Sequence, residues 1–169
     1  MKNYAYILVF LFVSTFSFSQ SKVGTIDVNY ILSKMPELKT VNDSLNAYGT
    51  RLDKQITIEI ERYQQLIDDY TKNESTYSQS ALEEKQLEIL TLENNINKLR
   101  QNAIQLIQLK DDDLKRPLYE KIGQSLEKVA KSGGYTQVLS LDMNSNVVYI
   151  DDQYDLTDSV LQDLGLPID

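Results

Sequence analysis

The sequence contains no cysteine, histidine or tryptophan. Without cysteine, the chain can form no disulfide and can carry no lipid on a lipobox cysteine. Without histidine, it lacks the side chain that most often performs acid–base catalysis at neutral pH, and a Ser nucleophile would have no such base beside it. Walker and Rossmann glycine loops are also absent, and Gly133-Gly134 has the character of a helix stop. These absences argue against an enzyme and against a bound cofactor.

Carboxylates remain as candidates for chemistry. The pairs and triplets fall on predicted helix surfaces, where a solvated face is a simpler interpretation than a catalytic pair; they are Asp68-Asp69, Glu83-Glu84 and Asp111-Asp112-Asp113. Four aspartates near the C-terminus offer oxygen ligands suited to calcium, namely Asp151, Asp152, Asp155 and Asp158. They lack the spacing of an EF-hand loop, and two of them, Asp155 and Asp158, also fit the cap and first turn of a helix. We therefore predict no metal site.

The first residues resemble a secretory signal peptide. Lys2 is followed by an apolar stretch from Tyr4 to Phe18, and Ser17 and Ser19 occupy the small-residue positions that a signal peptidase prefers. The stretch is shorter than the ~20 residues that span a bilayer, although an uncleaved anchor is an alternative. We expect residues 1–19 to be removed, which leaves a periplasmic chain with no stable membrane insertion.

The mature chain is acidic. Lys2 is one of 17 basic residues and all 25 acidic residues follow it, so 16 basic and 25 acidic residues leave a net charge of −9. Binding to nucleic acid depends largely on Lys and Arg that neutralise phosphates. We therefore expect no nucleic-acid partner, and no attraction to anionic lipid surfaces.

A long helical pattern occupies the middle of the chain. Apolar residues follow 3-4-3-4 spacing, as in the seam of a coiled coil, first at Leu38, Val41, Leu45, Tyr48 and Leu52, then at Ile56, Ile60, Tyr63, Ile67 and Tyr70, and again at Ile89, Leu92, Ile96, Leu99, Ala103 and Leu106. The consecutive four-residue steps from Leu52 to Ile56 and Ile60 predict a stutter. A polar stretch at 71–80 separates the two legs, with Ser80 or Ser78 as the next helix cap. The pattern predicts an antiparallel helical hairpin over 37–131; a single kinked rod is the alternative.

Strand-like segments flank this hairpin. Residues 23–27 precede it, with Asp27 as the expected cap of a short helix, and residues 135–141 and 146–150 follow it, ahead of a short C-terminal helix. We predict an α+β fold in which residues 20–36 and 132–169 form a small sheet body and the hairpin is inserted into it.

Tyr63, Tyr70 and Tyr77 recur at intervals of seven residues near the end of the first leg. They can pack in the hairpin seam, or they can present an amphipathic surface to another protein, because a tyrosine ring is apolar with a polar hydroxyl. For Tyr77, in the predicted turn, neither interpretation is favoured. Other apolar residues lie off the predicted seam, and they either offer such a contact surface or pack in a thicker helix bundle; they are Ile58, Leu87, Leu90, Ile104 and Ile107.

The ends of the chain resemble the Skp (OmpH-like) family of periplasmic chaperones. The resemblance rests on Lys22–Lys39 (KVGTIDVNYILSKMPELK), Arg116–Leu139 (RPLYEKIGQSLEKVAKSGGYTQVL) and Asp155–Leu164 (DLTDSVLQDL). It covers essentially the whole mature chain, in order. The terminal blocks are fairly specific, whereas the middle would match many coiled coils.

The resemblance implies a homotrimer whose sheets associate into a body, with the hairpins as tentacles around a cavity. Unfolded outer-membrane proteins would be held there without ATP. For the sheet core or trimer contact the candidates are Val23, Ile26, Val138, Leu139 and Val148, and for client contact they are Tyr63, Tyr70, Tyr77, Leu87 and Leu90.

One departure concerns charge, because the best-known members of the family have positively charged arm tips. Residues 63–85 here contain two lysines and five carboxylates. Capture would then rest on apolar contact, or the clients would differ. The alternative function is that of a structural or tethering coiled coil of the cell envelope.

Overall fold

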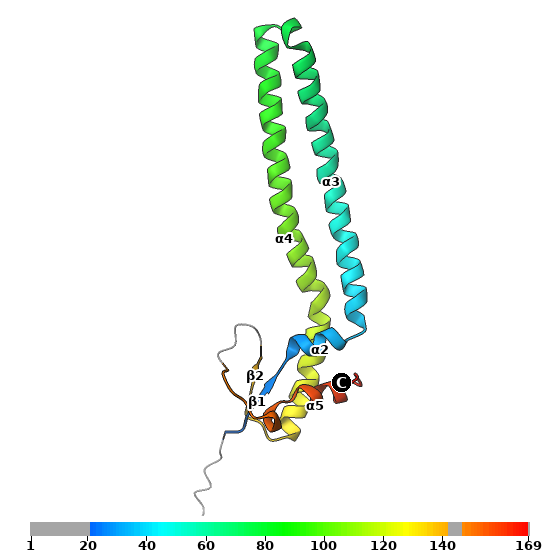
Figure 1. Cartoon of the computed structure of the whole chain (residues 1–169), viewed down its shortest axis with the longest axis vertical. Helices are drawn as coiled ribbons and strands as arrows, with labels where there is room; N and C mark the ends of the chain where they lie inside the picture. The colour runs from blue at the N-terminus through cyan, green and yellow to red at the C-terminus, as the bar shows by residue number, and fades with distance from the viewer. Residues whose placement is uncertain (1–20, 142–146, 169) are drawn as a thin grey trace, which may run out of the picture. The chain divides into compact units, whose positions relative to one another are not determined.

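The computed structural model describes residues 21–141 and 147–168 (Figure 1). The elements in chain order are β1 (Val23–Ile26), α2 (Val28–Lys34), α3 (Glu37–Asn73), the 3-10 turn η1 (Glu74–Thr76), α4 (Gln79–Ser132), β2 (Gln137–Ser140), the 3-10 turn η2 (Asp152–Tyr154) and α5 (Thr157–Asp163). The chain divides into two compact units. We call residues 32–121 the hairpin unit, and residues 21–31 with 122–168 the sheet unit.

Helices α3 and α4 run antiparallel in the hairpin unit (Figure 1). Helix α3 has 37 residues, which corresponds to about 55 Å at 1.5 Å per residue. Ser78 caps the N-terminus of α4, because its Oγ accepts a hydrogen bond from the Ala81 amide at 3.3 Å. Of the two candidate caps, Ser78 and Ser80, the first is therefore the N-cap of α4.

The helices meet along a seam with a period of eleven residues rather than seven. On α4 the inward-facing pairs are Leu92 and Ile96, Ala103 and Ile107, and Leu114 and Leu118. Two predicted seam residues are more exposed than their heptad positions imply, with Leu99 at 36% and Leu106 at 41%. An eleven-residue repeat has 3.67 residues per turn, close to the 3.6 of a straight helix, so this seam requires little supercoiling.

Ile107, which the sequence pattern placed off the seam, belongs to it. A Cβ added at Gly49 of α3 would lie 3.9 Å from Ile107 Cδ1, so these two positions face one another across the hairpin. On α3, Leu52 and Ile56 of the predicted stutter are half-buried, and so are Tyr63 and Ile67 eleven residues later.

The sheet unit contains a two-stranded parallel sheet. Strands β1 and β2 pair from Val23 with Gln137 to Ile26 with Ser140. The prediction of a third strand at 146–150 is wrong for its described residues, because 147–150 adopt no strand. The position beside β1 is taken instead by Asp155, which bridges to Thr25, and the next amide, of Leu156, donates to Thr25 O at 2.8 Å.

A compact apolar core fills the sheet unit, formed by Ile26, Ile31, Ile122, Leu156, Val160 and Leu161. Asp27 caps α2 as predicted, since its Oδ1 accepts from the Tyr30 amide at 2.8 Å. Gly24 allows a close approach, because a Cβ there would lie 2.4 Å from Leu156 Cδ1. After α4, Gly134 has a φ of 68°, the left-handed conformation that ends many helices.

Candidate functional site

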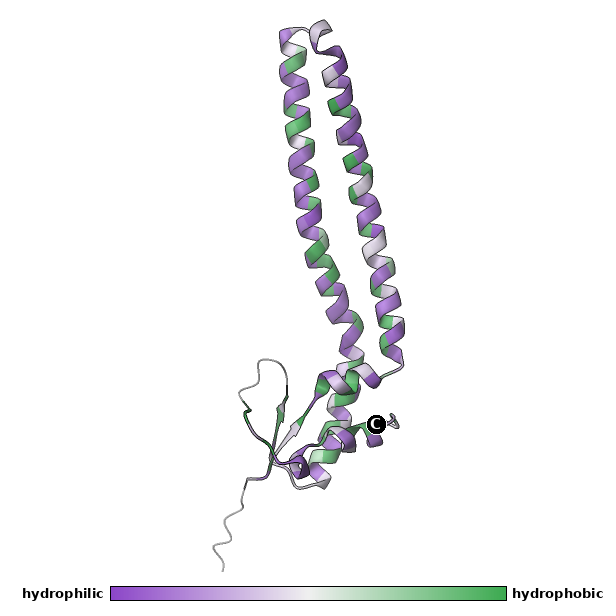
Figure 2. Ribbon diagram, in the orientation of Figure 1, coloured by the Kyte–Doolittle hydropathy of each residue, from purple (hydrophilic) through white to green (hydrophobic). Residues whose placement is uncertain are grey.

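The hairpin unit exposes large apolar side chains on α4. Leu87 is 65% exposed and Leu90 is 54% exposed. Leu87 precedes the seam residue Ile96 by nine residues, which places the two on opposite sides of the helix at 100° per residue. Leu90 follows Leu87 by three residues and shares its face. Figure 2 shows hydrophobic residues along α4 on the side away from α3 as well as on the side toward it. Here the sequence candidates Leu87 and Leu90 form an apolar surface without a partner in the described residues.

A shallow hollow of about 330 Å³ adjoins this surface. It is lined by Arg62, Glu84, Leu87, Glu88, Thr91, Leu92 and Asn95. A second hollow, of about 270 Å³, is lined from α3 by Ile60, Tyr63 and Gln64 and from α4 by Glu93, Ile96, Asn97 and Arg100. Both hollows combine aliphatic side chains with a few charged groups. This lining suits the weak binding of an extended chain better than it suits a small molecule.

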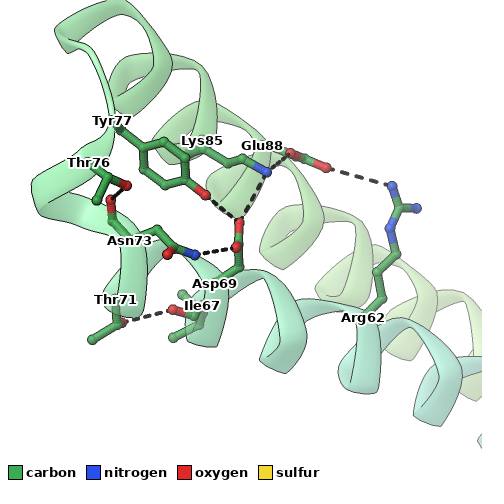
Figure 3. Close-up of polar contacts among 9 residues, drawn as sticks. All are labelled: Arg62, Ile67, Asp69, Thr71, Asn73, Thr76, Tyr77, Lys85 and Glu88. Carbon is green, nitrogen blue, oxygen red and sulfur yellow. Dashed lines mark hydrogen bonds and ion pairs between the residues drawn. The ribbon is translucent and has the colours of Figure 1, made fainter.

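The tyrosines near the turn make specific polar contacts, and those around Tyr77 are drawn in Figure 3. Tyr77 Oη donates to Asp69 Oδ2 at 2.7 Å, and Asn73 Nδ2 donates to Asp69 Oδ1 at 2.8 Å. Tyr70 Oη accepts from Gln86 Nε2 at 2.7 Å, which links α3 to α4. The hydroxyls of Tyr70 and Tyr77 thus hold the end of the hairpin together, and both residues are half-buried.

The same contacts shift two pKa values. The hydrogen bond from Tyr77, followed by that from Asn73, lowers the pKa of Asp69. The hydrogen bond to Asp69 raises the pKa of Tyr77. Both groups therefore remain in their hydrogen-bonding forms, carboxylate and phenol, at neutral pH.

An ion-pair chain continues along the hairpin (Figure 3). Lys85 Nζ lies 3.6 Å from Asp69 and 3.8 Å from Glu88, and Arg62 lies 3.9 Å from Glu88 across the seam. Exposed pairs of this length contribute little stability individually. The pairs from Arg62 to Glu88 and from Asp69 to Lys85 connect α3 with α4 beside the Leu87 hollow.

The candidates for self-association lie in the sheet unit in different environments. Ile26 is 2% exposed and belongs to the core of the unit, so it is not a surface contact. Val138 is half-buried, whereas Val23 and Leu139 are 38% and 45% exposed. Val148 is 99% exposed and lies outside the sheet. Within the described residues β2 pairs only with β1, which leaves its other edge open.

Leu109 and Tyr149 are among the exposed apolar residues that were not singled out from the sequence. Leu109 is 61% exposed on α4, and Tyr149 is 84% exposed beside Val148. Leu109 follows the last predicted seam residue, Leu106, and Tyr149 lies within the predicted strand at 146–150, so the pattern did not mark either as an exposed apolar residue. Only the position of the seam, and the absence of strand pairing at 147–150, shows them to face outward.

The C-terminal aspartates act as local caps. Asp155 Oδ1 accepts from the amide and hydroxyl of Thr157 at the start of α5, and Asp151 accepts from Gln153. In the described part of the chain, no group of three or more acidic side chains is arranged to hold a metal ion. No helix among residues 21–141 and 147–168 has the length and apolar character needed to cross a bilayer.

Comparison with known proteins adds two findings. A family model described as Outer membrane protein (OmpH-like) matches residues 22–164. The fold is similar to the crystal structure of a protein proposed as an outer membrane chaperone (OmpH-like) from Caulobacter crescentus, with a TM-score of 0.65 and 15% sequence identity. That similarity covers 86% of this chain and 85% of the other. No curated protein sequence matches the chain.

Proposed function

The chain belongs to the OmpH-like family, and from that premise we propose that it is a periplasmic holdase chaperone. In this proposal it binds unfolded outer-membrane proteins without ATP and prevents their aggregation. The family match and the fold similarity support a chaperone role in general. The client class and the holding mechanism are our own extension.

One observation carries the proposal, which is the exposed apolar surface of Leu87 and Leu90 on the side of α4 away from the seam. A tether requires buried seams and polar outer faces, whereas a holdase must leave apolar side chains accessible to its client. Contiguous exposed apolar residues on a helix commonly mark a contact with another protein. The shallow hollows beside the seam favour many weak contacts over a single deep pocket.

The proposal includes a homotrimer formed through the sheet unit, with the hairpins of three copies surrounding the client. The open edge of β2 supports it, because an unpaired strand edge is readily completed by another chain. The exposed side chains of Val23, Leu139 and Val148 would supply apolar contacts between copies. Ile26 would stabilise each copy from within.

The direct test is the refolding of an outer-membrane protein by dilution from urea, with and without the purified mature chain. We expect light scattering from aggregates to fall as the chain is added, with no nucleotide present. Undiminished scattering at a several-fold molar excess would contradict the holdase proposal and would favour a structural coiled coil. Bovine serum albumin at equal mass is the control for nonspecific protection.

A further inference from the structure

Charge is distributed unevenly along the hairpin unit. Residues 56–90, the distal part, contain eight acidic and three basic residues, which gives a net charge of −5. The rest of the unit, which we call the proximal part, comprises residues 32–55 and 91–121. It contains eight acidic and ten basic residues, which gives a net charge of +2. The negative charge of the hairpin is therefore concentrated in its distal part.

Most of the distal carboxylates are not neutralised. In the described residues, Arg62 and Lys85 pair with Glu59, Asp69 and Glu88. The remaining distal carboxylates form no ion pair within the same described residues; they are Glu61, Asp68, Glu74, Glu83 and Glu84. Five carboxylates without an ion pair in the described residues, close together on one end of the hairpin, create a negative potential at its surface.

Two of these carboxylates adjoin the apolar surface. Glu83 and Glu84 precede Leu87 by four and three residues, so all three share one face of α4. Glu84 and Leu87 also line the same hollow, where Arg62 is occupied by Glu59 and Glu88 at 3.9 Å. If an apolar residue of an unfolded client covers Leu87, the client residues that flank it would lie beside these carboxylates.

We propose that the acidic distal surface, defined by Glu83, Glu84, Leu87 and Leu90, selects unfolded segments in which aliphatic or aromatic residues are flanked by Lys or Arg. This inference rests on the proposed function and specifies the client that the surface prefers. Apolar contact with the two leucines supplies the attraction common to all clients. The carboxylates favour cationic flanks and disfavour acidic ones, because like charges near an interface are repelled.

The experiment uses the mature chain and two unfolded fluorescent peptides with the same apolar residues, one flanked by lysines and the other by glutamates. Binding is measured by fluorescence anisotropy at low and at high salt. A typical exposed ion pair changes an equilibrium by about threefold, so two of them predict roughly tenfold tighter binding of the lysine peptide at low salt. Screening should reduce this preference at high salt.

Matched variants locate the effect. Glu83→Gln with Glu84→Gln should lower the preference for the lysine peptide to about twofold. Asp112→Asn with Glu120→Gln makes the same change of net charge at two exposed carboxylates of the proximal part that form no ion pair with any described residue, and it should leave the preference intact.

Each outcome has a distinct meaning. If both peptides bind equally well, or if the proximal variant reduces the preference as much as the distal one, the inference is overturned and the holdase proposal stands. If neither peptide binds at any salt concentration, the proposed function fails and the inference fails with it.

Discussion

Replacing Leu87 and Leu90 together with serine should weaken client binding while leaving the fold intact. Complete burial of a leucine contributes about 1.5–3 kcal/mol. Since 65% of Leu87 and 54% of Leu90 are exposed, a client can cover little more than half of each side chain. Allowing for the cost of ordering a client on the surface, we expect a loss of about 2 kcal/mol, which corresponds to roughly 30-fold in Kd.

The assay is anisotropy of a labelled unfolded segment of an outer-membrane protein, titrated with the variant and with the unchanged chain. Because both leucines face solvent, urea unfolding should give a free energy within about 0.5 kcal/mol of the original. Leu109→Ser is the matched control, since Leu109 is 61% exposed on the same helix but outside the distal surface. The reasoning is refuted if the double variant binds within twofold of the original, or if Leu109→Ser is equally defective.

Three further predictions concern other parts of the chain. Tyr77→Phe removes the hydrogen bond that lowers the pKa of Asp69, so an NMR titration should show that pKa returning toward its ordinary 3.8. In the unchanged chain the stabilisation from Asp69 is present above its ordinary pKa and is lost as the pH falls through its lowered pKa in the folded state. Amide exchange at 74–78 should therefore accelerate, relative to its intrinsic rate, only in strong acid. Acceleration already at pH 5 would contradict the assignment of this hydrogen bond. Under the proposed trimer, Leu139→Ser with Val148→Ser should lower the mass measured by light scattering from that of three copies to that of one, and an unchanged mass would exclude these contacts. Gly24→Ala should lower the free energy of unfolding by about 1–3 kcal/mol, because the added Cβ overpacks the core beside Leu156. An unchanged urea denaturation midpoint would contradict this, since it would show that the core accommodates the methyl group without loss of stability.

Local signals in the sequence predicted the helical elements well. A capping residue acts within one turn, so Asp27 could be identified as a cap from its neighbours alone. For α4 the sequence left Ser80 and Ser78 as alternatives, and the capping hydrogen bond lies at Ser78. The long apolar pattern between residues 37 and 131 likewise predicted α3 and α4, since few breakers interrupt it. Even Pro117 is accommodated within α4.

The period of the seam could not be read in the same way. Heptad and eleven-residue repeats share the same steps of three and four residues and differ only by an angle that accumulates along the helix. Leu106 and Ile107 are adjacent, and both are large and aliphatic, so the pattern alone cannot choose between them. The opposing helix decides, because Gly49 leaves space for Ile107.

The sheet was predicted less well than the helices. The segment at 146–150 has the apolar, β-branched composition of a strand, but strand pairing depends on which edge is available. Asp155 and the Leu156 amide occupy the edge of β1 beside Thr25. For the candidate site, the sequence identified Leu87 and Leu90, whereas the polar contact of Tyr77 required coordinates, because Asp69 lies eight residues away across the turn.

The central claim is that this chain holds an unfolded outer-membrane protein in a soluble complex. Its most direct test is the mass of the species formed when a urea-unfolded outer-membrane β-barrel protein is diluted into the mature chain without nucleotide, measured by size exclusion with multi-angle light scattering. The account predicts a soluble complex of one client with three copies of the chain. Precipitation of the client, with the chain eluting alone at its own mass, would contradict it.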